Sequence, residues 1–323
     1  MRILFITSSR IGDAVLSTGL LDHLLRTHPT ARFTIACGPV ASELFTHMPN
    51  LERLIIFDKK RHSRHWLSLW WQCVFTPWHL VVDIRASAIA YLLPTRHRAI
   101  MRKRPGHKTT QLAAILNLTP PPLPVTWTSP EDRSKAETLL PPGPPIIALG
   151  PTANWPGKVW PPERFATLAK TLQSTILSNA RIAILAGPGP QEAALATPLL
   201  TALPNAINFT GTLTLSEAAA VLARATIFIG NDSGLMHLAA AAGTPTIGLF
   251  GPTNAAEYSP AGHTTAIAVS PTSSMTDLTV LSALDAVERL LGVGEQARRG
   301  LRPSTPQGTE SLDPLLKKAK GLI

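Results

Sequence analysis

The sequence predicts an α/β fold made of two Rossmann-like, doubly wound parallel-sheet domains that face each other across a cleft. Short apolar strands alternate with helical segments in both halves of the chain, which is typical of parallel sheets covered by helices on both faces. Two proline clusters, Thr119–Pro124 and Pro141–Pro145, interrupt this alternation near the middle. Because proline is excluded from the interior of parallel strands, these clusters indicate the seam between the domains.

Residues 1–140 are expected to form the first domain, residues 146–296 the second, and residues 297–323 a polar, loosely held tail. In the first half, Val15, Leu20, Leu21, Leu24 and Leu25 recur at helical spacing, while the strands are short apolar runs. The expected strands there are Arg2–Thr7, Phe33–Cys37, Leu54–Phe57 and Leu80–Ile84, and the expected helices are Ala14–Thr27, Val40–His47 and Pro130–Leu140.

The second half restarts the alternation after the second proline cluster. Proline or a small polar residue begins several of its helical segments, as is common at helix N-termini. The expected strands are Ile146–Leu149, Ile182–Ala186, Thr226–Ile229 and Thr246–Phe250, and the expected helices are Pro161–Gln173, Gln191–Leu200, Leu215–Arg224, Leu235–Ala242 and Thr279–Leu291.

Positive charge is concentrated in the first half of the chain. Residues 1–145 carry a net charge of +9, and residues 146–323 only +1. Such a surface attracts nucleic acid, an anionic membrane or a phosphorylated substrate, or is simply a solvated basic face. The basic residues that form two clusters are Lys59, Lys60, Arg61, Arg64, Arg96, Arg98, Arg102, Lys103 and Arg104. Trp70 and Trp71 follow the first cluster, and we expect one to pack in the core and the other to lie at an interface.

The sequence carries no sign of secretion or membrane insertion. Cys37 and Cys73 are too few for a disulfide framework or a zinc site. The N-terminus lacks signal-peptide architecture, and the most apolar long stretch, residues 67–82, is broken by Gln72, Pro77 and His79. We therefore expect a cytoplasmic protein.

The run GNDSG at residues 230–234 separates a strand from a helix of small residues. Strand, glycine-bounded turn and helix leave unpaired N–H groups at the positive end of a helix, which favours a phosphate-bearing ligand. His237, near the start of that helix, is expected to point toward this ligand. A run of this composition is also an ordinary turn.

Three further loops follow predicted strands. The first, SSRIGD at residues 8–13, lacks the glycine pattern of dinucleotide folds and the lysine of a P-loop. Asp13 there suits a general base or a helix cap. In the loop at residues 150–161, Asn154 and Lys158 suit a diphosphate, and Glu192 after AGPGPQ suits ribose hydroxyls or a helix N-terminus.

The order RIGDAVLSTGLL, NWPGKVWPPERF, AGPGPQE and GNDSGLMHLAAAAGTPTIGLFGPT resembles glycosyltransferase family 9, the ADP-heptose:lipopolysaccharide heptosyltransferases, over roughly residues 1–290. The resemblance implies the GT-B architecture, with an N-terminal domain that receives the acceptor and a C-terminal domain that grips the nucleotide sugar. It also implies an inverting transferase that needs no cofactor or metal, and no D-x-D motif is present. The implied partner is an anionic lipopolysaccharide precursor at the inner face of the inner membrane, with peripheral association of the enzyme there, and not nucleic acid.

The resemblance implies a role for each matching residue. Asp13 is expected to be the catalytic base and Lys158 the donor-phosphate lysine. Asn154 stands where the family usually has Ser or Thr, and Gly19 where it often has proline. The other residues implied to bind the donor are Glu192, Asp232, Ser233, Gly234, Leu235 and His237. A different nucleotide sugar or acceptor, a non-catalytic scaffold and a GT-B-like epimerase stay open as alternatives.

Overall fold

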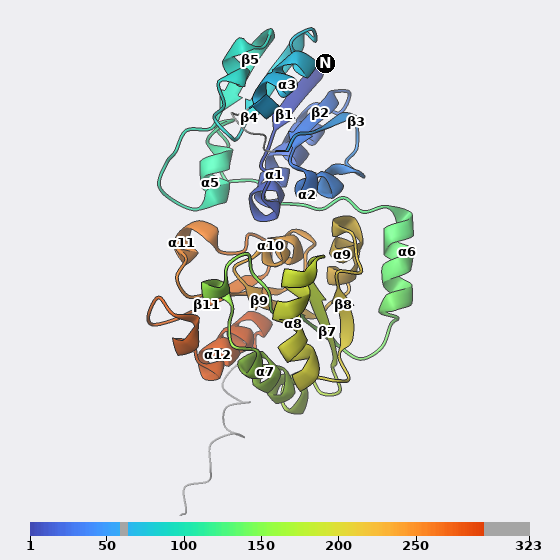
Figure 1. The fold of residues 1–323 in the computed structure, drawn as a ribbon, viewed down its shortest axis with the longest axis vertical. Coiled ribbons are helices and arrows are strands. Elements are labelled where there is room, and N and C mark those ends of the chain that lie inside the picture. Colours follow the sequence, from blue (N-terminus) through green and yellow to red (C-terminus); the bar gives the residue numbers. More distant parts are fainter. Residues whose placement is uncertain (59–63, 294–323) are drawn as a thin grey trace, which may run out of the picture.

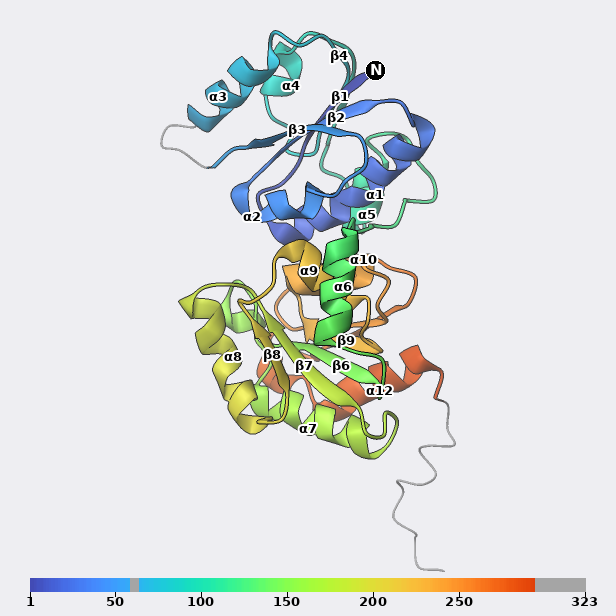
Figure 2. The same ribbon diagram turned by 90° about the vertical axis from the view of Figure 1, so that its right-hand side faces the viewer.

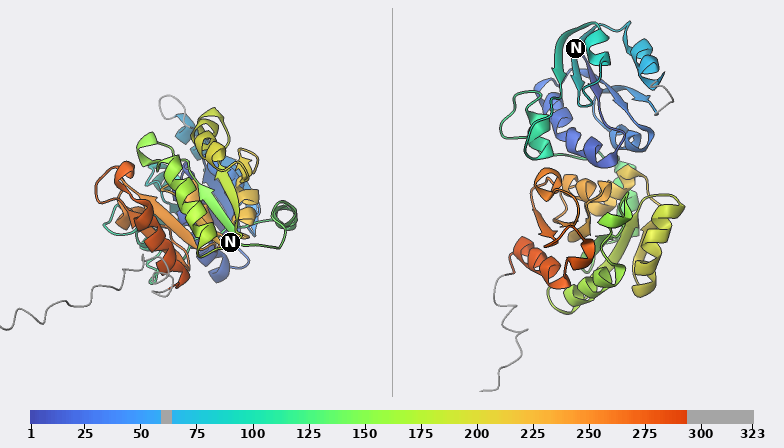
Figure 3. Two further views of the ribbon diagram at one scale, coloured as in Figure 1. Left: turned by 90° about the horizontal axis from the view of Figure 1, so that it is seen from below. Right: turned by 60° about the vertical axis from the view of Figure 1, so that its left-hand side comes forward.

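The computed structural model describes residues 1–58 and 64–293 and contains two parallel sheets stacked along the long axis of the molecule (Figures 1 and 3). The first sheet has the order β3-β2-β1-β4-β5, with strands at Leu51–Ile56, Arg32–Cys37, Arg2–Ile6, Trp78–Asp83 and Thr95–Ile100. The second has the order β11-β10-β9-β6-β7-β8, with strands at Thr265–Val269, Thr246–Phe250, Ile227–Asn231, Ile146–Gly150, Arg181–Ala186 and Ile207–Thr210. The expected two-sheet α/β fold is confirmed.

Helices cover both faces of each sheet because side chains alternate along every strand. In β1, Ile3 and Phe5 pack with α1, whereas Leu4 and Ile6 pack with α3 and α4. In the second sheet, α9 and α10 lie on one face, and α7, α8 and α12 on the other. The helices are α1 (Ile11–Thr27), α2 (Pro39–Ser42), α3 (Arg64–Cys73), α4 (Ile89–Leu92), α5 (Lys108–Ala113), α6 (Pro130–Leu139), α7 (Pro162–Ser174), α8 (Pro190–Ala202), α9 (Leu215–Leu222), α10 (Gly234–Ala241), α11 (Ala255–Tyr258) and α12 (Val280–Leu291).

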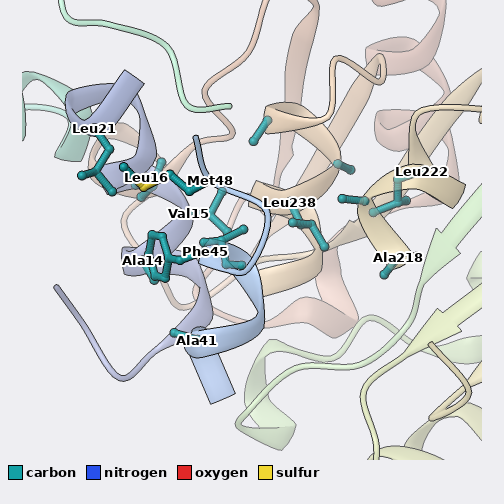
Figure 4. Packing of buried hydrophobic residues seen from close by; sticks show 14 of the residues in the cluster. Ala14, Val15, Leu16, Leu21, Ala41, Phe45, Met48, Ala218, Leu222 and Leu238 are labelled. Carbon is teal, nitrogen blue, oxygen red and sulfur yellow. The ribbon is translucent and has the colours of Figure 1, made fainter. Parts of the chain in front are cut away.

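The two halves share one apolar core. The cluster that contains Ala14 and Val15 of α1 continues through Leu238 of α10 to Leu222 of α9 (Figure 4). Helix α1 is therefore packed between the first sheet and the C-terminal half (Figure 2). Burial of this surface holds the two parallel sheets in a defined arrangement.

The proline clusters lie on either side of α6. This helix begins with a capping box, in which the Ser129 hydroxyl accepts from the Asp132 N–H and the Asp132 carboxylate accepts from the Ser129 N–H. It packs against α9, where Lys135 Nζ lies 2.7 Å from Glu217 Oε1. The boundaries at residues 140 and 146 stay a prediction, and the tail at residues 297–323 lies outside the described residues.

Several elements differ from the sequence prediction. Helix α1 begins at Ile11, three residues earlier than expected, so Asp13 belongs to its first turn. Strands β5, β8 and β11 and the short helices α5 and α11 were not expected. The strands β5, β8 and β11 all lie at sheet edges. Their side chains are partly exposed, which an edge strand tolerates.

The two neighbouring tryptophans of α3 differ in burial, as expected. Trp70 is half-buried and its Nε1 donates to the carbonyl oxygen of Leu92 at 3.3 Å, whereas Trp71 is exposed. Cys37 and Cys73 are both buried free thiols. Within residues 1–58 and 64–293, no helix qualifies as a membrane-spanning segment.

Candidate functional site

The start of α1 and the start of α10 lie directly against each other. A β-carbon added at Gly12 would lie 2.9 Å from His237 Cδ2, and one added at Gly234 would lie 2.8 Å from Ile11 Cβ. Real β-carbons do not approach other atoms so closely, so glycine at both positions permits the contact. The loop after β1 and the loop after β9 therefore come together between the two halves.

Lys158 is brought to the same place by the loop after β6. A 3₁₀ turn at Pro156–Lys158 directs the lysine inward, and its Nζ lies 2.7 Å from Asp232 Oδ2. The Asp232 side chain is 8% exposed and that of Lys158 is 20% exposed. This largely desolvated ion pair holds a positive charge beside the N-terminus of α10.

Asn231 fixes the position of the Lys158 loop, and the sequence analysis missed this role. Its Oδ1 accepts from Trp160 N at 3.0 Å, and its Nδ2 donates to the Pro151 carbonyl at 2.8 Å. The residue is fully buried, so both bonds are made away from water. An asparagine at the end of a buried strand and directly before Asp232 is the sequence signal that could have indicated it.

His237 is buried, and burial lowers the pKa of its imidazole to about 4 although Asp232 and Asp13 act in the opposite direction. His107 and Lys158 add to the lowering. The ring is therefore neutral at pH 7. Asp13 belongs to the N-terminal half, yet its carboxylate raises the pKa of His237 and so lies near the start of α10. The contact of Gly12, the preceding residue, with His237 agrees with this.

Two polar atoms of the loop at residues 232–237 are buried without a protein partner. Ser233 Oγ and His237 Nδ1 have no hydrogen bond among the described residues. Ser233 is also the N-cap of α10 and makes no side-chain capping bond there. Unsatisfied polar atoms at a helix N-terminus are suited to an anionic ligand such as a phosphate.

Asp13 is half-buried in the first turn of α1, where its Oδ2 accepts from Ser8 Oγ at 3.4 Å. Gly234 begins α10 and Leu235 follows it, half-buried. Asp13, Lys158 and residues 232–237 thus come from three separate segments of sequence and meet at the carboxyl ends of the strands, where parallel sheets bind their ligands.

The other two predicted donor residues lie less centrally. Asn154 is exposed in the loop after β6. Glu192 lies in the first turn of α8, and its Oε2 accepts from Gly187 N at 3.3 Å. The carboxylate therefore braces the loop after β7, and its suggested contact with ribose stays a prediction.

The basic residues do not form one patch. Arg102 and Arg104 follow β5 and line a pocket of about 300 Å³ together with Arg98. Arg104 also lines a second pocket of about 480 Å³ with Lys103 and, from the C-terminal half, Glu257. Arg96 lies at the start of β5, beside the start of β4, and so at the opposite end of the strand. Lys59, Lys60 and Arg61 lie outside the described residues, as does the side chain of Arg64.

A second contact between the halves was not expected from the sequence. His107, the N-cap of α5, accepts from Thr109 N through Nδ1 and donates from Nε2 to the Ser259 carbonyl at 2.9 Å. Nearby, Gln111 Nε2 donates to Glu257 Oε1 at 3.2 Å. No local pattern signals a contact between residues 152 positions apart.

In the described parts of the chain, no group of three or more His, Cys, Asp or Glu side chains is arranged to hold a metal ion. Lys158, with its side chain 20% exposed, supplies a positive charge to the candidate site.

Known proteins share both sequence and fold with this chain. The model of glycosyltransferase family 9 (heptosyltransferase) matches residues 106–287, which is more than half of the sequence. Lipopolysaccharide heptosyltransferase 2 of Salmonella typhimurium is 24% identical over 307 residues, covering 81% of this chain and 86% of the relative. Lipooligosaccharide heptosyltransferase 2 of Haemophilus influenzae is 36% identical over 122 residues, but this alignment spans only 36% of this chain and 34% of the relative.

Two solved structures show the same fold at low sequence identity. A glycosyltransferase family 9 protein from Veillonella parvula superposes with a TM-score of 0.76 at 20% identity, covering 91% of this chain and 97% of the other. The E. coli heptosyltransferase WaaC, solved with ADP, gives a TM-score of 0.71 at 18% identity, covering 90% and 99%. The GT-B fold expected from the sequence is confirmed.

Proposed function

Because this chain belongs to glycosyltransferase family 9, a family of heptosyltransferases, we propose that it transfers heptose from ADP-heptose to the inner core of a lipopolysaccharide precursor. The observation that carries this proposal is the contact between the starts of α1 and α10, which brings Asp13 near the Lys158–Asp232 pair and His237. A base on one side and a diphosphate site on the other are the two requirements of an inverting transfer without a metal.

The reaction breaks the bond between the anomeric carbon and a diphosphate oxygen, and forms a bond to an acceptor hydroxyl oxygen. Asp13 takes the hydroxyl proton as the oxygen attacks from the face opposite the leaving group. Lys158 and the N-terminus of α10 stabilise the negative charge that grows on the departing ADP. Ser233 Oγ and His237 Nδ1, which are buried without partners among the described residues, are the side-chain atoms proposed to bind the donor.

His237 takes part as a neutral group in this scheme. With a pKa of about 4, it stays uncharged near neutral pH and leaves Lys158 as the cation of the site. The ion pair with Asp232 orients Lys158 before the donor arrives, so less conformational entropy is lost on binding. Lys158 is proposed to exchange part of its contact with Asp232 for the donor phosphates.

The acceptor is proposed to enter from the side of Arg98, Arg102 and Arg104. Their pocket lies at the end of β5. The segment that follows β5 also lines the second pocket, together with Glu257 of the C-terminal half. Guanidinium groups match phosphate and carboxylate groups bidentately, and a lipopolysaccharide precursor carries both.

The first experiment is a calorimetric donor screen with ADP-heptose, ADP-glucose, UDP-GlcNAc and GDP-mannose. We expect selective binding of ADP-heptose, weakened about tenfold or more in Lys158→Ala, because a charge-assisted contact to a phosphate is lost. Lys170→Ala, an exposed lysine on α7, is the matched control and should bind like the wild type. Preference for another nucleotide sugar would refute the donor assignment, and the absence of any binding would favour a non-catalytic scaffold.

A further inference from the structure

Helix α3 and the turn that follows it expose an apolar stripe on the outer surface of the N-terminal half. Leu67 and Trp71 of the helix and Phe75 of the turn follow one another at intervals of four residues, and they are 66%, 63% and 75% exposed. Leu69 and Cys73, on the opposite side of the helix, are fully buried against the sheet. Helix packing is therefore already satisfied by the inner side, and the outer stripe has no role in the core.

The neighbouring helix α4 extends this apolar surface. Tyr91 and Leu92 are 63% and 64% exposed, and the Trp70 indole N–H bonds to the Leu92 carbonyl, which ties the two helices together. The rings of Trp71 and Phe75 pack edge to face, with centroids 5.3 Å apart. We name Leu67, Trp71, Phe75, Tyr91 and Leu92 the aromatic face. Isolated exposed apolar residues are ordinary, but five on two adjoining helices and the turn after α3 indicate an interaction surface.

Arginines border the aromatic face and keep their positive charge. Arg53 donates to the Gln72 carbonyl and side chain, Arg98 donates to the Ala90 and Leu93 carbonyls, and the Arg85 guanidinium lies 5.9 Å from the centre of the Trp66 ring. The hydrogen bonds of Arg53 and Arg98 are to neutral groups, while Arg85 also interacts electrostatically with the buried Asp83 carboxylate. In the sequence between residues 53 and 130 the carboxylates are Asp58 and Asp83, and Asp83 is fully buried, where it accepts from Ser87 and the Arg85 N–H.

We propose that the aromatic face is a docking surface for an anionic phospholipid bilayer. Trp and Tyr favour the boundary between lipid tails and head groups, Leu and Phe enter the acyl region, and bordering arginines attract anionic head groups. The combination of apolar stripe and positive rim fits a bilayer better than a nucleic acid, which has no apolar layer to receive Leu67 or Leu92.

The position of the face relative to the candidate site supports this partner. Helices α3 and α4 cover the side of the N-terminal sheet away from α1, and hence away from the C-terminal half (Figure 2). Tyr91 belongs both to the aromatic face and to the pocket lined by Arg98, Arg102 and Arg104. This inference rests on the proposed function in one respect, namely that a lipid-linked acceptor would pass from the bilayer along these arginines.

The experiment is flotation of the purified full-length protein with vesicles, without donor or acceptor. Vesicles of phosphatidylethanolamine and phosphatidylglycerol are compared with vesicles of phosphatidylcholine, at low and high salt. We expect binding to the anionic vesicles that weakens with salt and falls about tenfold in Leu67→Ser and further in the double variant Trp71→Ser, Phe75→Ser. Leu281→Ser is the control, because Leu281 is also 66% exposed on a helix but lies in the C-terminal half.

Failure of this inference can be told apart from failure of the proposed function. Equal binding of wild type and the aromatic-face variants, or an equal loss in Leu281→Ser, would overturn the docking surface. Self-association of the wild type that is abolished by Trp71→Ser would overturn it too, by identifying a second copy as the occupant. Since vesicle binding is measured without substrates, neither result depends on the donor, and the calorimetric screen tests that separately. Transfer to a soluble, deacylated acceptor should be unchanged in Leu67→Ser and in the double variant Trp71→Ser, Phe75→Ser.

Discussion

Asp13 owes its position to the glycine that precedes it. Gly12 lets the first turn of α1 reach the ring of His237, and Asp13 is carried into the space beside the α10 loop. A carboxylate in the first turn of a helix is a common capping arrangement. Here, however, the N-cap Arg10 has no side-chain capping bond and the Asp13 carboxylate accepts from Ser8, which leaves it available to an incoming hydroxyl group.

Asp13→Asn should lower the transfer rate constant about 10²–10⁴-fold, because an amide cannot accept the proton. The melting temperature should change little, since the Ser8 contact can be retained. Asp22→Asn on the same helix, which removes an ion pair with Arg26, is the control and should leave the rate unchanged. Retention of the wild-type rate by Asp13→Asn would exclude it as the base.

His237 should make stability depend on pH. Its folded-state pKa of about 4 lies below the ordinary value of 6.5, so the unfolded chain binds a proton that the folded chain resists. The stability associated with the neutral ring is therefore fully present above pH 6.5 and is lost as the pH falls toward 4, by about 3 kcal/mol at most. Urea unfolding of wild type and His237→Gln at pH 7.5 and pH 5 tests this, and the variant should lose less stability between the two. Parallel losses would contradict it.

At the scale of elements, the loop after β6 depends on Asn231. Asn231→Ala would leave the Trp160 N–H and the Pro151 carbonyl buried without partners, at a cost of about 2–4 kcal/mol. Because Lys158 belongs to the same loop, ADP-heptose affinity should fall as well. Chemical denaturation and calorimetry measure the two effects. Asn208→Ala removes an exposed side chain on β8 whose Oδ1 accepts from Thr210 N, and it should affect neither by as much.

The contact between the starts of α1 and α10 can be tested by adding single methyl groups. Gly12→Ala places a β-carbon against His237 and should destabilise the protein by about 1–3 kcal/mol while lowering activity. Gly187→Ala is the control, because its β-carbon would meet Glu192 at an ordinary 3.5 Å. Equal behaviour of the two variants in thermal unfolding and transfer assays would show that the close approach is unimportant.

The sequence was sufficient for elements whose patterns are strong and local. Buried strands such as β6 and β10 are unbroken apolar runs, and GNDSG marks the turn before α10. Edge strands were missed because their patterns are mixed: β5, which reads TRHRAI with Ile100 at its end, was interpreted as part of a basic cluster. The contact of His107 with Ser259 depends on tertiary structure, so composition and spacing do not indicate it. The partners of Asn231 also depend on tertiary structure, although its place at the end of a buried strand, directly before Asp232, was a signal that could have been used.

At the scale of the whole molecule, the apolar core shared by α1, α9 and α10 links the stability of the two halves. We expect a single calorimetric unfolding transition, although chains with two sheets of this kind often unfold in steps. Leu238→Ala, at the centre of that core, should destabilise the whole chain by about 2–5 kcal/mol without splitting the transition. Two separate transitions in the wild type would show that the halves fold independently.

The interlocked starts of α1 and α10 have a consequence for exchanging parts between relatives. Ile11 and Gly12 come from one half, and Gly234 and His237 from the other. Gly12 leaves room for His237, and Gly234 leaves room for Ile11, so a larger residue at either glycine would collide with the other half. A hybrid enzyme that takes its N-terminal half from a relative would therefore need residues 11–12 and 234–237 to be taken from the same parent. Hybrids joined at the proline-rich connections around α6 but mismatched at this point should misfold or lose activity, even when each half is intact. Recombination between family members is thus constrained less by the connecting chain than by two glycines that lie far from it in sequence.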